Sequence, residues 1–384
     1  MKIVFVSNYL TLHQIPFCNE MYKRLGKDFC FIATIPMETE RTNMGWGIKE
    51  KYPYEILFNH DVLAQKIIDQ ADIVLYGSAP ENVISKRLEE KMPIVYYSER
   101  ILKNGRWHAL SPRAIKNMIV HHTRYFRNPN YLLCSSAYSA GDYGVFGAYW
   151  GKTYKWGYFP ETKKYTSKQL ESKKNNAVIQ ILWVGRLLKL KHPEVAIEVA
   201  LQLRRKNIDF KLTIIGEGEQ RQCIQDKIVE NRLSDVVKVY GFMAPKKVRE
   251  YMEKSNVFLF TSDFKEGWGA VLNEAMNSGC AVIASHAIGA APYLIENGVN
   301  GYLYQNGNMS DMFSKIEKLA VNREECHKLG ENAYRTIINM WNSEVAAERF
   351  IDFASAVANH AELPKYGDGP LSKAGFLSDS WFKS

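Results

Sequence analysis

The stretch of sequence that decides the fold class runs from Val257 to Gly279. It reads Val257-Phe-Leu-Phe260-Thr-Ser-Asp263-Phe-Lys-Glu266-Gly-Trp-Gly269-Ala-Val-Leu-Asn-Glu274-Ala-Met-Asn-Ser-Gly279. A short apolar run, typical of a buried strand, leads through a glycine-containing loop into a helical segment. This order of strand, loop and helix is the repeating unit of an α/β fold with a parallel sheet.

The same alternation recurs on both sides of this stretch. In the first half, β-branched and aromatic runs predict strands at residues 3–6, 29–33, 73–76, 94–97 and 131–134. In the second half, similar runs predict strands at residues 178–184, 212–215, 236–240, 257–260 and 281–284. Helical segments separate the runs, so the 384 residues are expected to form two facing Rossmann-like domains.

Changes in composition suggest where these domains begin and end. Residues 1–160 are expected to form the N-terminal domain and residues 177–335 the C-terminal domain, with a polar, lysine-rich linker at 161–176. A helix at 336–358 is expected to return to the N-terminal domain and to pack across both domains. Residues 359–384 predict a poorly ordered or surface-laid tail.

Composition also argues against several classes of protein. The chain has no run of 18 apolar residues, so we expect no transmembrane helix, and the apolar run after Met1 is too short for a secretory signal. The six cysteines form no CxxC pair, which favours buried thiols in the reducing cytoplasm. The net charge of +9 favours an anionic partner.

A cationic loop with two candidate phosphate-binding residues, Arg186 and Lys191, follows the first predicted strand of the second half. The segment reads Leu182-Trp-Val-Gly185-Arg186-Leu-Leu-Lys189-Leu-Lys191-His192-Pro193. The guanidinium fork of Arg186 and the ammonium group of Lys191 can clamp the two phosphates of a diphosphate. An ordinary basic surface loop explains these residues equally well.

Two further turns are candidates for contact with a nucleotide. Gly216 and Gly218 end a predicted strand, and glycine lets the backbone approach a ligand closely. Phe242 follows another strand, where its ring or the nearby backbone could meet a nucleobase. A core phenylalanine after a turn is the simpler explanation for the side chain of Phe242.

The stretch quoted first also holds groups that suit an anion and a sugar. Backbone amides at the expected helix start can cradle an anion, namely those of Gly267, Trp268, Gly269 and Ala270. Glu266 in the loop and Glu274 in the helix can accept hydrogen bonds from sugar hydroxyls. An acidic residue near a helix start also favours the helix dipole. That alternative explains Glu266 but not Glu274, which is expected two turns into the helix.

Taken in order, these motifs resemble those of the retaining GT-B glycosyltransferases of family four. They are a Gly-Arg pair with a lysine five residues on, a Gly-Glu-Gly turn, a Glu-x7-Glu element, and the continuation Ser285-His-Ala-Ile-Gly289-Ala-Ala-Pro292-Tyr-Leu-Ile-Glu296-Asn-Gly298-Val-Asn-Gly301. The resemblance covers residues 178–322. Within that family, the chain resembles bacterial enzymes of cell-surface polysaccharide and lipopolysaccharide synthesis.

The resemblance implies a hexosyltransferase that retains stereochemistry at the transferred sugar. It would move a hexose or N-acetylhexosamine from a UDP- or GDP-linked sugar to a hydroxyl of a glycan or a polyprenyl-diphosphate-linked acceptor. Arg186 and Lys191 would hold the phosphates, Glu274 the ribose, and Glu266 would lie near the transferred sugar. The resemblance implies neither a cofactor nor a metal, and the chain lacks the DxD motif of metal-dependent transferases.

The first half, expected to bind the acceptor, departs from the usual pattern of the family. Its first loop reads Ser7-Asn8-Tyr9-Leu-Thr-Leu-His13-Gln14-Ile-Pro16, and a later strand ends in Ser98-Glu99-Arg100. Because ligands bind outside the carboxyl ends of strands in such sheets, His13 or Glu99 could act as a catalytic group in the cleft. A helix-capping or loop-stabilising role explains each residue equally well.

The segment from Arg100 to Gly141 holds seven Lys or Arg and no Asp or Glu, with interleaved aromatic residues. A lipid-linked diphosphate acceptor at the anionic inner face of the cell membrane would match both features, and a solvated basic helix is the alternative.

Nucleic-acid binding is not expected, because no helix-turn-helix, RNP-like or zinc motif is present. A sugar-nucleotide epimerase and a non-catalytic subunit that binds a nucleotide-sugar remain alternative functions.

Overall fold

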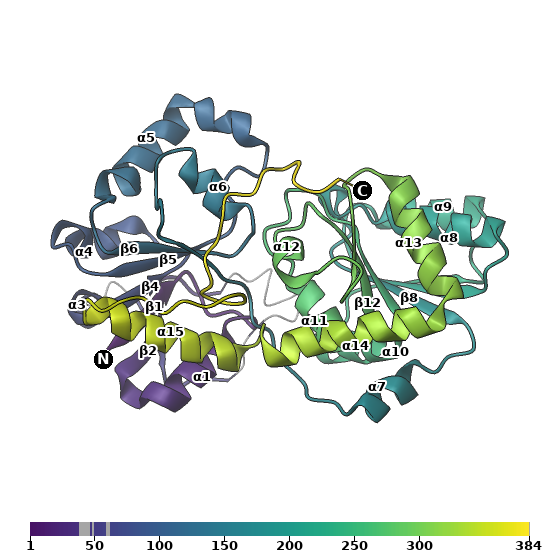
Figure 1. Ribbon diagram of the computed structural model, residues 1–384, viewed down its shortest axis with the longest axis horizontal. Helices are drawn as coiled ribbons and strands as arrows, with labels where there is room; N and C mark the ends of the chain where they lie inside the picture. The colour runs from purple at the N-terminus through teal and green to yellow at the C-terminus, as the bar shows by residue number, and fades with distance from the viewer. Residues whose placement is uncertain (38–46, 48–49, 59–61, 384) are drawn as a thin grey trace. The chain divides into compact units, whose positions relative to one another are not determined.

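The computed structural model describes residues 1–37, 47, 50–58 and 62–383 (Figure 1). The chain divides into two compact units. Unit 1 comprises Met1–Glu161 and Trp341–Ser378, and unit 2 comprises Thr162–Met340 and Asp379–Ser384. Within the described ranges, no helix has both the length and the apolar character needed to cross a bilayer.

Unit 1 contains a parallel sheet with the strand order β3-β2-β1-β4-β5-β6-β7. The strands are β1 (Ile3–Ser7), β2 (Phe29–Ala33), β3 (Glu55–Leu57), β4 (Ile73–Tyr76), β5 (Ile94–Ser98), β6 (Asn130–Cys134) and β7 (Thr153–Lys155). Every residue of β1 and β4 is buried, as expected for central strands covered on both faces. The strand order reverses direction between β1 and β4, which is where ligands bind in doubly wound sheets.

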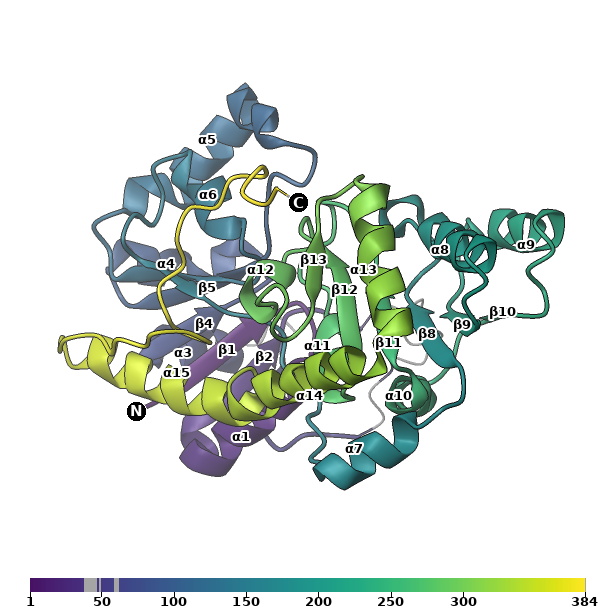
Figure 2. The ribbon, with the colours of Figure 1, turned by 45° about the vertical axis from the view of Figure 1, so that its right-hand side comes forward.

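Helices cover both faces of the unit 1 sheet. Helices α1 (Ile15–Leu25) and α15 (Ser343–Ala358) pack together on one face, and α5 (Pro112–His121) and α6 (Ser139–Gly144) lie on the other (Figures 1 and 2). The connections include α3 (Val62–Gln70), α4 (Ser85–Glu89) and the 3₁₀ helices η1 (Gly26–Asp28), η3 (Glu81–Ile84), η4 (Arg106–Leu110) and η5 (Thr123–Tyr125). The ring of Phe350 on α15 lies 5.9 Å from that of Phe17 on α1.

Unit 2 contains a second parallel sheet, with the order β10-β9-β8-β11-β12-β13. Its strands are β8 (Ile179–Val184), β9 (Phe210–Ile215), β10 (Val237–Tyr240), β11 (Val257–Phe260), β12 (Ala281–Ser285) and β13 (Tyr302–Tyr304). This sheet also reverses its strand order, here between β8 and β11. Both units are therefore Rossmann-like, in agreement with the α/β class expected from the sequence.

The helices of unit 2 form two groups, one on each face of the sheet (Figure 2). One group is α8 (Glu194–Arg205), α9 (Arg221–Glu230) and α13 (Met309–Val321). The other is α7 (Ser167–Lys174), α10 (Pro245–Lys254), α11 (Val271–Asn277) and α14 (Arg323–Asn339). The short helices η6 (Lys189–Lys191) and α12 (Ala291–Leu294) lie in loops. Helix α14 belongs to unit 2, whereas α15, which follows it in the chain, belongs to unit 1.

The segment 161–176 is not the exposed linker that its polar composition suggested. It contains α7, whose first turn is closed by a capping box between Thr166 and Gln169. Leu170 and Lys174 of this helix are buried, and Lys174 Nζ donates a hydrogen bond to Met252 O at 3.1 Å. Residues 162–176 therefore belong to unit 2 and pack against it through these two side chains.

The C-terminal tail is laid on the surface, but it is paired with the sheet rather than poorly ordered. The Lys155 N–H donates to Ser372 O at 2.7 Å, and the Leu371 N–H donates to Lys155 O at 2.8 Å. The Ala374 N–H donates to Thr153 O at 3.1 Å. These bonds cover β7, the last strand of the unit 1 sheet.

Candidate functional site

Two loops at one edge of the unit 2 sheet hold most of the predicted site residues. The cationic loop, residues 185–193, follows β8, and the acidic loop, residues 261–270, follows β11. Strands β8 and β11 are adjacent and parallel. Both loops therefore leave the carboxyl edge of the sheet, where ligands bind in folds of this kind.

Hydrogen bonds join the cationic loop to the acidic loop. Thr261 Oγ1 donates to Lys191 O at 2.6 Å and accepts a hydrogen bond from Trp183 Nε1 at 2.9 Å. The Asp263 N–H donates to Leu190 O at 3.0 Å. Trp183 and Thr261 are buried, so water does not compete for these bonds and the spacing of the two loops is fixed.

Lys191 and Glu266, which the sequence assigned to different parts of a ligand, contact each other in the structure. Lys191 Nζ donates to Glu266 Oε2, and Ser262 Oγ donates to the same oxygen at 2.9 Å. Their side chains are 15% and 12% exposed, so each keeps a small accessible surface. A cation and a carboxylate held side by side can bind a phosphate oxygen and a sugar hydroxyl at neighbouring positions.

His192 joins the same site, although the sequence analysis did not single it out. Its backbone is left-handed, with φ of 49°, and its Nδ1 lies 3.0 Å from Glu194 Oε1. On its other side, Nε2 lies 3.5 Å from Asp263 Oδ2. Hydrogen bonds to Asp263 and Glu194 favour the imidazolium and raise the pKa of His192 to about 9. Glu194, two positions after His192, was the sequence signal that this histidine could be held in its charged form.

Arg186 is exposed at the start of the cationic loop, and glycines pack against the backbone on either side of it. A Cβ on Gly216, whose φ is 151°, would lie 1.9 Å from Gly185 O. A Cβ on Gly218 would lie 2.5 Å from Leu187 O. These glycines therefore admit the neighbouring loop, which explains the need for glycine within the protein. The approach of their backbone to a ligand stays a prediction.

Phe242 lies on the surface, in the loop that follows β10. The side chain is 49% exposed, so the simpler explanation of a core phenylalanine is wrong. An exposed ring at the carboxyl edge of the sheet can stack on a flat ligand group such as a nucleobase.

Helix α11 begins later than the sequence predicts. Its first residue is Val271, so Glu274 lies in the first turn rather than two turns in, and the helix dipole can account for Glu274 as well.

The four residues of the predicted amide cradle, 267–270, are all buried. Trp268 Nε1 donates to Asn273 Oδ1 at 2.9 Å, and a Cβ on Gly269 would lie 2.6 Å from the ring of Phe260. The side chain of Trp268 therefore packs inside unit 2, and the binding of an anion by the backbone amides of residues 267–270 stays a prediction.

In unit 1, the structure brings His13 and Glu99 to one cluster through a residue that the sequence analysis missed. The ring of Tyr158 stacks on His13 with centroids 5.9 Å apart, and its hydroxyl donates to Glu99 Oε1 at 2.7 Å. Lys103 Nζ donates to the other carboxylate oxygen at 2.8 Å. Burial, with Tyr97 and Glu99 nearby, raises the pKa of Tyr158 well above its ordinary value, so Tyr158 stays protonated as a donor.

The second half of the chain is similar to a known family of proteins. Residues 165–336 match the model described as Glycosyl transferases group 1. The amylovoran biosynthesis glycosyltransferase AmsK of Erwinia amylovora is 28% identical over 185 residues, which are 47% of this chain and 45% of AmsK. The poly(ribitol-phosphate) alpha-N-acetylglucosaminyltransferase of Staphylococcus aureus is 30% identical over 170 residues, 44% of this chain and 34% of that protein. The matched stretch thus spans less than half of each relative.

Solved structures share the fold along almost the whole chain. HepE of Anabaena, solved in complex with UDP, superposes with a TM-score of 0.69 at 16% identity and covers 93% of this chain and 100% of HepE. The lipopolysaccharide outer core galactosyltransferase WaaB, solved without ligand, gives a TM-score of 0.64 at 18% identity and covers 92% of this chain and 98% of WaaB. The chain therefore has the GT-B fold, with two Rossmann-like domains.

Proposed function

We propose, from the match of residues 165–336 to the model described as Glycosyl transferases group 1, that this protein is a retaining hexosyltransferase. Its donor is a UDP- or GDP-linked hexose or N-acetylhexosamine, and its acceptor is a hydroxyl of a glycan or a lipid-linked saccharide in cell-surface polysaccharide synthesis. The observation that carries this proposal is the contact of Glu266 with both Lys191 and Ser262 at the carboxyl edge of the unit 2 sheet. The naming of AmsK for amylovoran biosynthesis and the UDP in HepE support the proposed acceptor and donor classes.

Each side chain of the site has a role that follows from its position. Arg186, exposed beside the fixed turn at Gly216, holds the donor diphosphate together with Lys191. Glu266 accepts hydrogen bonds from the transferred sugar once Lys191 turns to a phosphate oxygen. Glu274 accepts hydrogen bonds from the ribose, and the exposed ring of Phe242 stacks on the nucleobase.

The reaction we propose is a front-side substitution at the anomeric carbon. The bond from that carbon to the diphosphate oxygen breaks while the acceptor oxygen bonds on the same face, and the proton of the acceptor hydroxyl passes to the departing diphosphate. Arg186 and Lys191 stabilise the charge that develops on this leaving group. Because two cationic side chains supply this stabilisation, we propose that the reaction needs no metal ion.

The test is turnover of a nucleotide-sugar by purified protein. A thermal-shift screen of UDP- and GDP-sugars identifies the donor first, since a ligand that binds only the folded state raises the unfolding temperature. With that donor, Arg186→Ala should lower kcat by roughly a hundredfold or more, as expected for loss of a donor to a developing anion. Arg205→Ala, which changes an exposed arginine on α8, is the matched control and should leave kcat unchanged.

Product analysis decides between this proposal and its alternatives. A glycoside that forms only when acceptor is added supports transfer, and turnover in the presence of EDTA supports independence from metal. Conversion of the nucleotide-sugar into an isomer without acceptor would identify an epimerase and contradict the proposal. Unchanged turnover in Arg186→Ala would contradict the assignment of the diphosphate clamp.

A further inference from the structure

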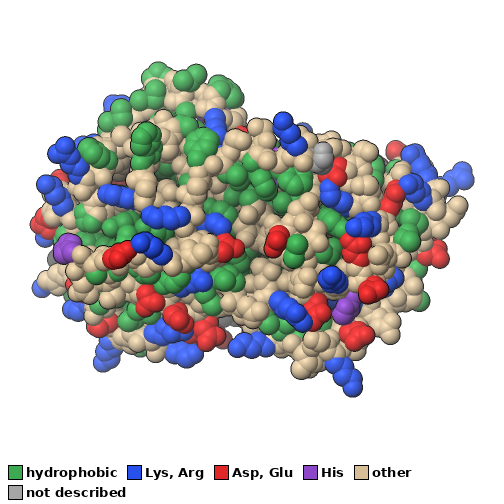
Figure 3. Space-filling model, in the orientation of Figure 1, with side chains coloured by type: hydrophobic (Ala, Val, Ile, Leu, Met, Phe, Trp, Pro, Cys, Tyr) green, Lys and Arg blue, Asp and Glu red, His purple; other side chains and the backbone are tan. Residues whose placement is uncertain are grey.

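One face of unit 1 exposes apolar and basic side chains together. Around α5 and η4, which we name the α5 face, Leu110 is 80% exposed, Trp107 is 69% exposed and Ile119 is 50% exposed. Figure 3 shows hydrophobic side chains gathered at this end of the surface, over α5. Transfer of such side chains out of water is favourable, so this concentration on one face indicates a binding surface.

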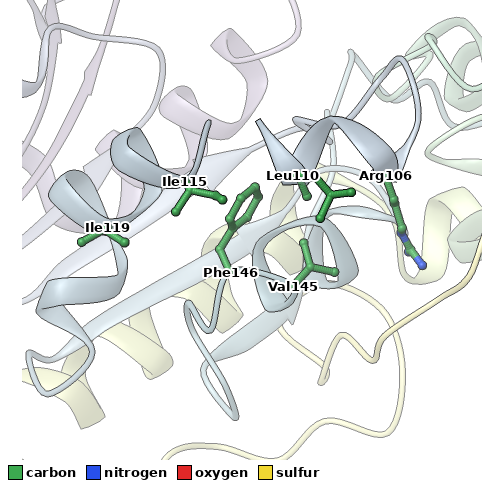
Figure 4. Close-up of a pocket in the computed structure, with 7 residues that line it drawn as sticks. Arg106, Leu110, Ile115, Ile119, Val145 and Phe146 are labelled. Atoms are coloured by element: carbon green, nitrogen blue, oxygen red, sulfur yellow. The ribbon is translucent and has the colours of Figure 1, made fainter. Parts of the chain in front are cut away.

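A groove runs through the α5 face. It has a volume of about 530 Å³ and lies between Ile115 and Ile119 of α5, Leu110 of η4, and Val145 and Phe146 after α6 (Figure 4). Ile115 and Ile119 are one helical turn apart, so they present their side chains to the same side of α5. The walls are almost wholly aliphatic or aromatic, which suits an apolar occupant.

Part of the positive charge of the 100–141 segment is neutralised inside unit 1. Arg100 Nη2 lies 3.3 Å from Asp142 Oδ1, and both side chains are fully buried. Arg106 Nε lies 3.8 Å from the same oxygen, and Lys103 is paired with Glu99. Asp142 comes one residue after the acid-free segment, so the sequence pattern overstated the charge at the surface.

The remaining basic residues of the segment are exposed beside the apolar ones. They are Arg113 and Lys116 on α5, and Arg124 and Arg127 just after it. The guanidinium of Arg127 lies 5.4 Å from the ring of Phe126, which is 60% exposed. The segment that supplies this face contributes no Asp or Glu.

We infer that the α5 face binds the surface of an anionic lipid bilayer. Basic side chains next to exposed Trp, Phe, Leu and Ile match an interface in which phosphate groups lie directly above acyl chains. A bilayer supplies negative charge at every point, which fits four exposed cations spread over two elements better than one anionic ligand would. The inference goes beyond the proposed function and does not rest on it, because binding to vesicles needs neither donor nor acceptor.

The test is sedimentation of the full chain with two kinds of vesicle. One is made of phosphatidylcholine alone, and the other of phosphatidylcholine and phosphatidylglycerol at a ratio of roughly two to one. We expect the protein to pellet with the anionic vesicles only, and to be released as added salt screens the charges. The double variant Arg113→Gln/Lys116→Gln should bind the anionic vesicles about 25-fold more weakly than the unaltered chain, because each charge removed weakens binding about fivefold. Leu110→Gln should weaken binding roughly tenfold.

Matched controls separate the α5 face from the net charge of the protein. Lys168→Gln/Arg205→Gln removes two exposed charges from unit 2, and Val321→Gln changes a side chain of unit 2 that is 74% exposed. Both should bind like the unaltered chain. Equal losses in these controls, equal binding to neutral vesicles, no binding to either vesicle, or displacement by inorganic pyrophosphate would each overturn the inference.

Discussion

Lys191 and Glu266 show, at the scale of single residues, what a motif can predict and what it cannot. Their spacing within separate motifs marked both as ligand-binding groups, and both lie at the carboxyl edge of one sheet. Nothing in the sequence indicated that they contact each other, because 75 positions separate them. The contact depends on the pairing of β8 with β11, which is a property of the folded sheet.

Gly216 and Tyr158 show two ways in which residue patterns mislead. Gly216 was marked as a point of close approach to a ligand, but the backbone at Gly185 already explains the need for glycine, and the ligand contact stays a prediction. Tyr158 lies outside any motif, and only the folded chain places it between His13 and Glu99. A residue pattern in the sequence indicates that a position is constrained, whereas only the folded structure shows which residue it contacts.

The charge on His192 should make stability depend on pH. The folded-state pKa of about 9 is above the ordinary value of 6.5, so the stabilisation is complete below about pH 6.5 and is lost as pH rises through about 9. The His192 side chain is 37% exposed, so solvent screens its pairing with Asp263 and Glu194 and the effect should be small. Unfolding temperatures measured across this range should fall for the unaltered chain.

His192→Asn is the matched variant for this measurement, because asparagine tolerates the left-handed backbone at φ of 49°. It should be less stable than the unaltered chain at low pH, and the difference should shrink toward about pH 9. Stability curves that stay parallel across the range would show that folding does not raise the pKa of His192.

At the scale of elements, strand length decided what the sequence could predict. The strands of four or more residues were predicted from apolar runs, to within two residues at each end. The strands β3, β7 and β13 have three residues each and were missed, because three residues give no readable alternation. Helix α7 was missed because its only large apolar residue is Leu170, and its capping box was the available signal.

Gly330 lies in the interior of α14, although glycine is a poor helix former. A Cβ at this position would lie 2.3 Å from Gly279 O, a backbone atom that cannot move cheaply. Gly330→Ala should therefore lower the free energy of unfolding by about 1–3 kcal/mol, although alanine is the better helix former. Urea denaturation measures the change.

The control for this prediction is Gly144→Ala, in α6 of unit 1. The nearest atom to an added Cβ there is Trp150 Nε1 at 3.9 Å, which is ordinary contact. Gly144→Ala should be neutral or slightly stabilising. If both substitutions shift the urea midpoint equally, the close approach of α14 to Gly279 is not what requires glycine.

At the scale of the whole molecule, the tail that covers β7 should control self-association. Deleting residues 360–384 removes three backbone hydrogen bonds to β7, worth on the order of 3 kcal/mol together. It also exposes an edge strand whose free N–H and C=O groups can pair with another chain. We expect a lower unfolding temperature and light scattering that rises with protein concentration.

A shorter deletion, of residues 379–384, leaves the tail paired with β7 and serves as the control. It should scatter light like the full chain at every concentration. If the longer deletion scatters no more than the shorter one, the tail does not protect the edge of the sheet.

The division of the chain into units also sets an order of completion during synthesis. Apart from its last few residues, unit 2 is one continuous stretch, Thr162–Met340, whereas unit 1 is assembled from Met1–Glu161 and Trp341–Ser378. A ribosome releases the first stretch of unit 1 early, but Phe350 can cover Phe17 only after all of Thr162–Met340 has been made. The domain that starts first is therefore finished second, and its nascent α1 is the surface that a chaperone would meet in the meantime.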